Sequence, residues 1–272
     1  MTDSSRVIHI MGIVNLTDDS FYGPSRIPAG TGPDVLHARI ASMLSEGADI
    51  IDLGACSTRP GSEPVGEDEE WRRFKAVLPG IRNSFPQAVL SLDTYWPSVI
   101  RKAYDLVGPV IVNDVTAAGQ DCAYGSASML ATTAELGLTY VAMHWSGDTS
   151  MIPSSESVVD SVLGFFERFA SRAEAAGLQD WWLDPGFGFS KTVEQNYELL
   201  RALPALKERF GRPMLVGVSR KSFIYKPLGI TAAESLSATQ LVHMSALQGG
   251  ADILRVHDVA EAVRTVKLYR LL

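Results

Sequence analysis

The sequence has only two cysteines, and it lacks the features that mark secreted and membrane proteins. Cys56 and Cys122 form neither a disulfide framework nor a zinc-ligand spacing, so we expect two free thiols. Residues 1–6 lack the basic start and apolar run of a signal peptide. No run reaches the roughly 18 to 20 apolar residues that span a bilayer. We therefore predict a cytoplasmic protein with no membrane partner.

The chain also lacks an excess of basic residues. It has 24 Lys and Arg against 31 Asp and Glu, which gives a net charge of −7. General nucleic-acid binding needs a basic face, so we expect no nucleic-acid partner. An anionic small substrate is still compatible with this charge, because a few local Arg and Lys side chains can dominate one cleft.

What the chain does contain is a set of eight short runs rich in Val, Ile and Leu. They are residues 7–14, 49–53, 89–92, 110–112, 139–143, 181–183, 214–218 and 252–256. Such runs are typical of strands that are covered on both faces. Apolar residues at helical spacing fill most of the gaps, for example before Gly47, Gly177 and Gly249. The helical pattern is weakest in the gaps at 96–106 and 127–136.

Strands that alternate with helices predict an α/β protein with a parallel sheet. Eight such units fit a closed (β/α)8 TIM barrel better than an open doubly wound sheet, because no GxGxxG follows the first strand. A chain of 272 residues, 46% of them hydrophobic, suits one such barrel. No linker, composition shift or long repeat marks a boundary, so we predict a single catalytic domain over residues 1–272.

Polar side chains stand at or just after every predicted strand end. They are Asn15, Asp52, Asp93, Asn113, His144, Asp184, Lys221 and the pair Arg255 and His257. In a TIM barrel the active site lies where strands end and the following loops begin. One Asp or Asn there is commonly a turn former or helix cap, but a set of caps does not require long cationic side chains. We therefore predict an enzyme whose active site is this ring.

The ring divides into two chemical groups. One mixes carboxylates with amide and ammonium groups: Asp93, Asn113, Asp184 and Lys221. It suits a flat heterocycle in a buried pocket, where unpaired polar atoms are costly. The other is poor in acceptors and mostly cationic: Asn15, Arg59, Arg255 and His257. It suits phosphate oxygens shared with Mg²⁺, so the pattern predicts a heterocycle that carries a phosphate or diphosphate.

Eight short motifs then follow one another along nearly the whole chain. They read GIVNLT from residue 12, STRPG from 57, SLDT from 91, NDV from 113, MH from 143, LDPGFGF from 183, SRKSF from 219 and RVHDV from 255. In this order they resemble the dihydropteroate synthase family, over about residues 7–270. The SRKSF and RVHDV segments together are the most specific.

The resemblance implies a transferase of folate biosynthesis. It would condense 6-hydroxymethyl-7,8-dihydropterin diphosphate with p-aminobenzoate to give 7,8-dihydropteroate and diphosphate. The resemblance also implies Mg²⁺ as cofactor, a homodimer and a target for sulfonamides.

The resemblance further implies a role for individual residues. The pterin site would be Asp52, Asp93, Asn113, Met143, Asp184 and Lys221. The diphosphate site would be Asn15, Arg59, Arg255 and His257, with Asn15 as a metal ligand. The p-aminobenzoate site would be Thr58, Arg59, Pro60, Phe189 and Ser222. The catalytic residues would be Lys221, Arg255, Asp93 and Asp184.

Such a reaction needs neither a nucleophile nor a histidine base from the protein, because the aromatic amine is itself the nucleophile. Diphosphate leaves readily once cations balance its charge, and an aromatic amine is already neutral at pH 7. Carboxylates near the pterin would favour positive charge on the methylene carbon. We therefore expect a substitution in which diphosphate departs first.

Two alternatives stay open at this level. A pterin-dependent methyltransferase domain would share the pterin-binding carboxylates, but it is not expected to combine SRKSF, RVHDV and STRP. A catalytically silent pterin-binding protein is favoured slightly by the first loop, where Asp18 stands in place of the family's usual Pro. Intact Lys221, Arg255 and Asn15 oppose that alternative, and we expect Asp18 or Asp19 to supply a compensating Mg²⁺ contact.

Overall fold

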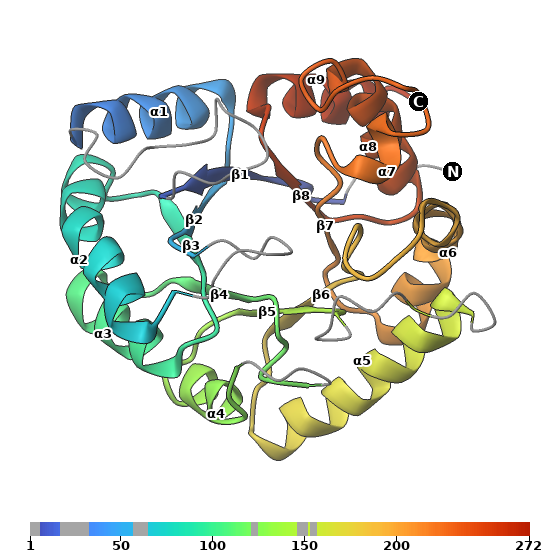
Figure 1. Ribbon diagram of the computed structural model, residues 1–272. Coiled ribbons are helices and arrows are strands. Elements are labelled where there is room, and N and C mark those ends of the chain that lie inside the picture. The colour runs from blue at the N-terminus through green and yellow to red at the C-terminus, as the bar shows by residue number, and fades with distance from the viewer. Residues whose placement is uncertain (1–5, 17–32, 57–64, 121–124, 146–151, 153–156) are drawn as a thin grey trace.

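Eight parallel strands form one sheet that closes on itself. The computed structural model describes residues 6–16, 33–56, 65–120, 125–145, 152 and 157–272. The strand order is β6-β5-β4-β3-β2-β1-β8-β7, and a bridge between Leu183 and Met214 joins the two ends. Helices surround the strands on the outside (Figure 1). The predicted (β/α)8 TIM barrel is confirmed.

The strands follow the predicted apolar runs closely. They are β1 (His9–Asn15), β2 (Ile50–Gly54), β3 (Val89–Asp93), β4 (Ile111–Asp114), β5 (Tyr140–Met143), β6 (Trp181–Asp184), β7 (Leu215–Val216) and β8 (Ile253–Val256). Only β7 is much shorter than its run at 214–218. It ends early because the chain turns there, and the Lys221 amide N–H donates to the Val218 carbonyl at 3.2 Å.

Helices follow each strand, including the two gaps with the weakest pattern. They are α1 (Pro33–Glu46), α2 (Glu67–Ser84), α3 (Pro97–Val107), α4 (Ser128–Glu135), α5 (Val158–Ala175), α6 (Val193–Phe210), α7 (Ser222–Tyr225), α8 (Leu236–Gln248) and α9 (Val259–Tyr269). None of those in the described part of the chain is long and apolar enough to cross a membrane.

The start of α6 is fixed by a capping box. The Thr192 hydroxyl accepts from the Gln195 amide at 3.1 Å, and the Gln195 side chain accepts from the Thr192 amide at 2.9 Å. Such reciprocal bonds satisfy two of the free N–H groups of a first turn. They anchor the C-terminal end of the loop that leaves β6.

An apolar layer fills the inside of the barrel. Its fully or nearly fully buried members are Met11, Ile50, Ile111, Val141, Leu215 and Ile253. Successive side chains of a strand point to opposite faces, so the residue two positions further along also points inward. Those residues are Asp52 after Ile50, Asn113 after Ile111, and Arg255 after Ile253. The polar ring is therefore the next layer of the barrel interior, toward the C-terminal ends of the strands.

Candidate active site

Asp52 is the centre of the hydrogen-bond network inside the barrel. Its carboxylate is fully buried and accepts from the Ser91 hydroxyl at 2.6 Å, from the Asn113 amide at 3.2 Å and from Arg255 Nε at 2.7 Å. These partners come from β3, β4 and β8. A buried carboxylate requires such partners, so Asp52 orients Asn113 and Arg255 toward the same space.

Arg255 joins Asp52 to a second carboxylate, that of Asp93 on β3. Its NH2 group lies 2.6 Å from Asp52 Oδ2 and 2.9 Å from Asp93 Oδ2. Burial alone would lower the pKa of Arg255, but the two carboxylates outweigh it and raise the pKa above its usual value. Burial raises the pKa of Asp93 to about 7, against the opposing effect of Arg255. Arg255 is thus permanently charged, whereas Asp93 titrates near neutrality.

This contact revises the division of the ring into two groups. The sequence suggested that Arg255 belongs with the anion-binding residues, apart from Asp93. The structure pairs its guanidinium with Asp52 and Asp93, because Arg255 and Asp52 occupy the same layer of the barrel. The heterocycle group and the anion group therefore meet at Arg255.

Asp184 and Lys221 form the opposite side of the ring. The buried Asp184 carboxylate, at the end of β6, accepts from the Gly186 amide at 2.8 Å, and burial raises its pKa. Lys221 Nζ donates to the Phe187 carbonyl and lies 4.7 Å from the centre of the Phe189 ring. Burial lowers the pKa of Lys221 to about 8, although Asp184 opposes the change.

His257 follows β8 and contributes a neutral ring. Its Nδ1 lies 3.0 Å from the Ser219 hydroxyl. Burial, together with the charge of Arg255, lowers the pKa of His257 to about 3. His257 can therefore offer an N–H group to an anion at neutral pH, but it adds no charge to the mostly cationic group that the sequence suggested.

Asn15 and Asp93 face the same small space at the top of the barrel. A Cβ atom added at Gly54 would lie 3.4 Å from Asn15 Oδ1 and 3.8 Å from Asp93 Oδ2. Within the described residues, no group of three or more His, Cys, Asp or Glu side chains could hold a metal ion. Carboxylate and amide oxygens suit Mg²⁺, which usually keeps several waters and binds through few protein ligands and substrate phosphates. The residues present therefore fit such an ion.

The remaining predicted residues lie at the rim or outside the described residues. Met143 is buried at the end of β5, and Ser222 is the first residue of α7. The Phe189 ring lies 6.2 Å from that of Trp145. The predictions for Thr58, Arg59, Pro60, Asp18 and Asp19 concern residues outside the described part of the chain.

His144, predicted as a ring member, contacts a lysine that the sequence did not single out. Its Nδ1 lies 2.9 Å from Lys191 Nζ, and its ring packs edge-on against Phe165 with 4.9 Å between centres. Burial lowers the pKa of His144 well below its usual value. Lys191 directly precedes the Thr192 cap, and that position gave no signal that its side chain turns inward.

The loop after β4 holds two alanines in a conformation that favours glycine. Ala117 and Ala118 have φ angles of 46° and 57°, where a Cβ atom is strained. Arg172 holds this turn by donating to their carbonyls at 3.2 and 2.7 Å. Asp114 holds it by accepting from the Ala118 amide at 3.0 Å.

Replacing Ala117 and Ala118 with glycine should therefore stabilise the protein. We expect each change to raise the free energy of unfolding by up to about 1 kcal/mol, because relief of strain exceeds the entropy that glycine adds to the unfolded chain. Urea unfolding measures the effect. Ala176→Gly, at a helix C-terminus with φ of −86°, serves as the control and should not stabilise.

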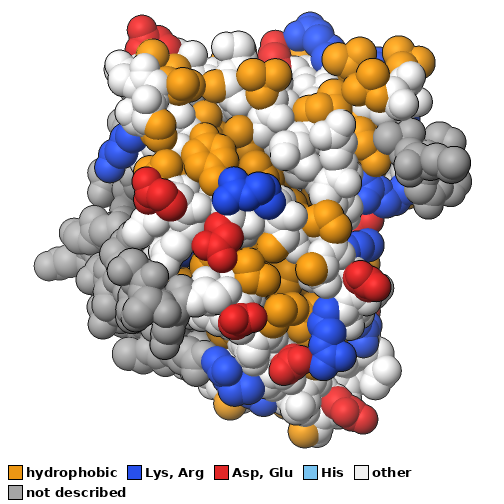
Figure 2. Space-filling model, turned by 90° about the vertical axis from the view of Figure 1, so that its right-hand side faces the viewer, with side chains coloured by type: hydrophobic (Ala, Val, Ile, Leu, Met, Phe, Trp, Pro, Cys, Tyr) orange, Lys and Arg blue, Asp and Glu red, His pale blue; other side chains and the backbone are white. Residues whose placement is uncertain are grey.

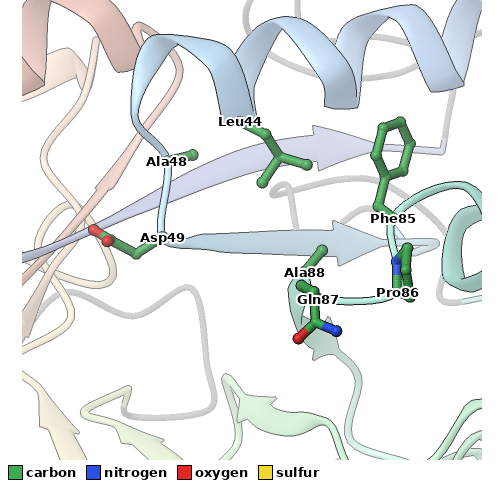
Figure 3. A pocket seen from close by; sticks show the side chains of 7 residues that line it. All are labelled: Leu44, Ala48, Asp49, Phe85, Pro86, Gln87 and Ala88. Atoms are coloured by element: carbon green, nitrogen blue, oxygen red, sulfur yellow. The ribbon is translucent and has the colours of Figure 1, made fainter.

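Two cavities lie at the opposite end of the barrel, where the strands begin. One, of about 340 Å³, is lined by Leu44, Ala48, Asp49, Phe85, Pro86, Gln87 and Ala88 (Figure 3). The other, of about 180 Å³, shares Asp49. Asp49 already accepts from the Ile10 amide at 2.7 Å, and the active sites of such barrels lie at the other end. The ring at the C-terminal ends is the better candidate.

Known proteins resemble the chain over nearly its whole length. A family model described as "Pterin binding enzyme" matches residues 11–257. A dihydropteroate synthase from Neisseria meningitidis serogroup C is 38% identical over 270 residues, which are 97% of this chain and 92% of that protein.

Solved structures agree with that likeness. The Yersinia pestis dihydropteroate synthase, in complex with a sulfonamide drug, has a TM-score of 0.85 and 34% identity over 99% of this chain and 94% of its own. The Xanthomonas albilineans dihydropteroate synthase, with 4-aminobenzoic acid, has a TM-score of 0.83 and 36% identity over 97% and 93% of the two chains.

Proposed function

The chain belongs to the pterin binding enzyme family, and we propose that its polar ring carries out the dihydropteroate synthase reaction. The enzyme is a transferase of folate biosynthesis. It joins p-aminobenzoate to 6-hydroxymethyl-7,8-dihydropterin diphosphate and releases diphosphate. The observation that carries this assignment is the buried network of Asp52, Asn113, Arg255 and Asp93, which places donors and acceptors beside one permanent cation.

The pterin heterocycle fits inside the ring of polar side chains, between Asp93 on one side and Asp184 on the other. Asp93 and Asp184 can accept from pterin N–H groups, and Asn113 and Lys221 can donate to its ring nitrogens and carbonyl. Met143 packs beside the heterocycle from the end of β5. Asp52 contributes through its bonds to Asn113 and Arg255, which it holds in place.

The diphosphate lies on the side of Asn15, Arg255 and His257. Arg59, outside the described residues, is assigned to the same site by its sequence motif. Arg255 offers a fixed cationic fork, which suits phosphate oxygens. Asn15 would hold Mg²⁺ together with the substrate. When bound, the ion neutralises phosphate charge and so makes diphosphate a better leaving group.

The amine enters from the rim, where Phe189 and Ser222 lie. Thr58, Arg59 and Pro60 are outside the described residues and are assigned to this site by their STRPG motif. Its nitrogen forms a bond to the exocyclic methylene carbon, and the C–O bond to diphosphate breaks with both electrons going to diphosphate. The proton that the amine nitrogen loses goes to the departing diphosphate or to water. Asp93 and Asp184 favour positive charge on the methylene carbon, so diphosphate leaves first.

A sulfonamide should compete with p-aminobenzoate for this rim site. Both are para-substituted anilines, and the same contacts would hold them. We expect the apparent KM for p-aminobenzoate to rise in proportion to sulfonamide concentration while kcat stays constant. Steady-state rates at several drug concentrations measure this. Unchanged rates at saturating drug would contradict the expectation.

The pH dependence of kcat/KM should be bell-shaped. Asp93, whose pKa burial raises to about 7, must lose its proton to accept from the pterin. Lys221, whose pKa burial lowers to about 8, must keep its proton. Activity should therefore rise through the first pKa and fall above the second.

The Lys221→Arg variant separates the two limbs, because a guanidinium stays charged throughout this range. Its residual activity should lack the alkaline limb and keep the acid limb. An alkaline limb that stays in place would show that another group causes it.

We further propose that the enzyme acts as a cytoplasmic homodimer. Leu241 on α8 is 75% exposed and Leu268 on α9 is 54% exposed. Figure 2 looks onto the side of the barrel near these helices, where hydrophobic side chains lie among charged ones. Sedimentation velocity tests the proposal, and a monomer at micromolar concentration would contradict it.

A condensation assay and a parallel methyl-transfer assay test the function and both alternatives. The protein is mixed with Mg²⁺, the pterin diphosphate and labelled p-aminobenzoate, and labelled dihydropteroate is sought by chromatography. Tight pterin binding without product would favour a silent pterin-binding protein. Methyl transfer from methyltetrahydrofolate to a corrinoid protein, in place of condensation, would favour the methyltransferase alternative.

A further inference from the structure

Lys191, in the loop between β6 and α6, is a buried lysine with three polar partners around its Nζ. Only 6% of the residue is exposed. Its Nζ lies 2.8 Å from the Gly186 carbonyl, 3.1 Å from the Phe189 carbonyl and 2.9 Å from His144 Nδ1. The Nζ group donates to the two carbonyls, and it meets His144 Nδ1 as donor or acceptor according to the tautomer of the ring. Burial lowers the pKa of Lys191 to about 7, and in either protonation state the side chain can donate to the two carbonyls.

The two carbonyls that Lys191 holds bracket the segment on which Lys221 rests. Lys221 donates to the carbonyl of Phe187, and its ammonium lies over the Phe189 ring. The stem of Lys221 also crosses this segment closely, since a Cβ atom added at Gly188 would lie 3.1 Å from Lys221 Cδ. The shape of residues 186–189 therefore decides where the Lys221 ammonium and the Phe189 ring lie.

We infer that Lys191 is a positioning residue for the synthase reaction. By binding the carbonyls of Gly186 and Phe189 and the ring of His144, it holds residues 186–189 in the shape that places Lys221 and Phe189 at the mouth of the barrel. The inference rests on the proposed function, in which Lys221 contacts the pterin and Phe189 contacts p-aminobenzoate.

The outer side of the same loop has a separate support. The Asn196 side chain accepts from the Gly188 amide at 2.7 Å and donates to the Thr192 carbonyl at 2.6 Å. These bonds tie the loop to the first turn of α6. Lys191 adds the tie on the inner side, next to the Gly186 amide that binds Asp184. Loss of Lys191 should therefore shift the rim of the site and leave α6 folded.

The Lys191→Met variant tests this role, because methionine fills a similar volume without donating. We expect a folded protein whose KM for p-aminobenzoate is raised by at least about tenfold, since small misplacements of binding groups have large effects on rate and affinity. The effect on kcat should be smaller. Lys267→Met, at an exposed lysine on α9, makes the same substitution far from the site and should change neither constant.

A double-variant cycle with Phe189→Ala separates positioning from general stability. If Lys191 acts through the Phe189 ring, adding Lys191→Met to Phe189→Ala should raise KM further by less than about twofold. Full additivity of the two effects would overturn the inference. So would a folded Lys191→Met protein with an unchanged KM.

Lys191→Gln keeps the test decisive if Lys191→Met does not fold. Its amide retains two N–H donors, and we expect an intermediate KM and the same non-additivity with Phe189→Ala. An unchanged KM in folded Lys191→Gln would also overturn the inference. Failure of the unmodified protein to make dihydropteroate overturns the proposed function, and the inference with it. Turnover by the unmodified protein with no effect in the variants overturns the inference alone.

Discussion

The Arg255→Leu variant should lose almost all synthase activity and much of its stability. Arg255 is the permanent cation that faces both Asp52 and Asp93, and it is proposed to hold the diphosphate. Removing one such electrostatic group costs about 100- to 1,000-fold in rate. It also leaves a fully buried Asp52 carboxylate without its counterion, which we expect to lower the free energy of unfolding by about 3 kcal/mol. Single-turnover rates and urea unfolding measure the two effects.

A second substitution separates these two effects. Adding Asp52→Asn to Arg255→Leu removes the uncompensated charge while Ser91 and Asn113 stay beside it. Part of the lost stability should return, but the activity should not. If activity returned together with stability, Arg255 would act only as a structural ion-pair partner, and its proposed role toward diphosphate would be wrong.

The Lys221→Met variant should lose activity without losing stability. We expect kcat/KM to fall by at least about 100-fold, because a charge-assisted donor to the pterin is lost. Stability should stay the same or rise, because burial already disfavours the charged ammonium, as its pKa of about 8 indicates. Its contacts within the chain are also replaceable, since Nζ meets one carbonyl and one aromatic ring.

Lys226→Met is the matched control for this variant. Lys226 is exposed at the end of α7, five residues further along the chain. It should leave both activity and stability unchanged. Loss of stability in Lys221→Met, with normal activity in the folded fraction, would contradict the catalytic role of Lys221.

The barrel and most of its polar ring could be predicted because apolar and polar residues follow the two-residue period of a strand. Residues two positions apart on a strand point the same way, so an apolar Ile50 or Ile253 followed by Asp52 or Arg255 indicates a buried layer with a polar layer above it. The short β7 was the least accurate strand, since only its turn at Val218 limits its length.

Properties that depend on burial and loop shape could not be read from the sequence. The neutral state of His257 follows from its burial beside Arg255, and neither is visible in a motif. Lys191 precedes a helix cap, a position where a lysine is commonly exposed. Only the fold of the loop brings it to His144 and Gly186.

The central claim is that the polar layer above the apolar barrel interior makes dihydropteroate. The most direct test is to quantify the dihydropteroate and diphosphate formed by the unmodified protein and, in parallel, by Arg255→Leu and Lys221→Met. The account predicts equal amounts of the two products from the unmodified protein and loss of both together in the variants. With p-aminobenzoate at saturation, diphosphate without dihydropteroate, or full turnover by either variant, would contradict it.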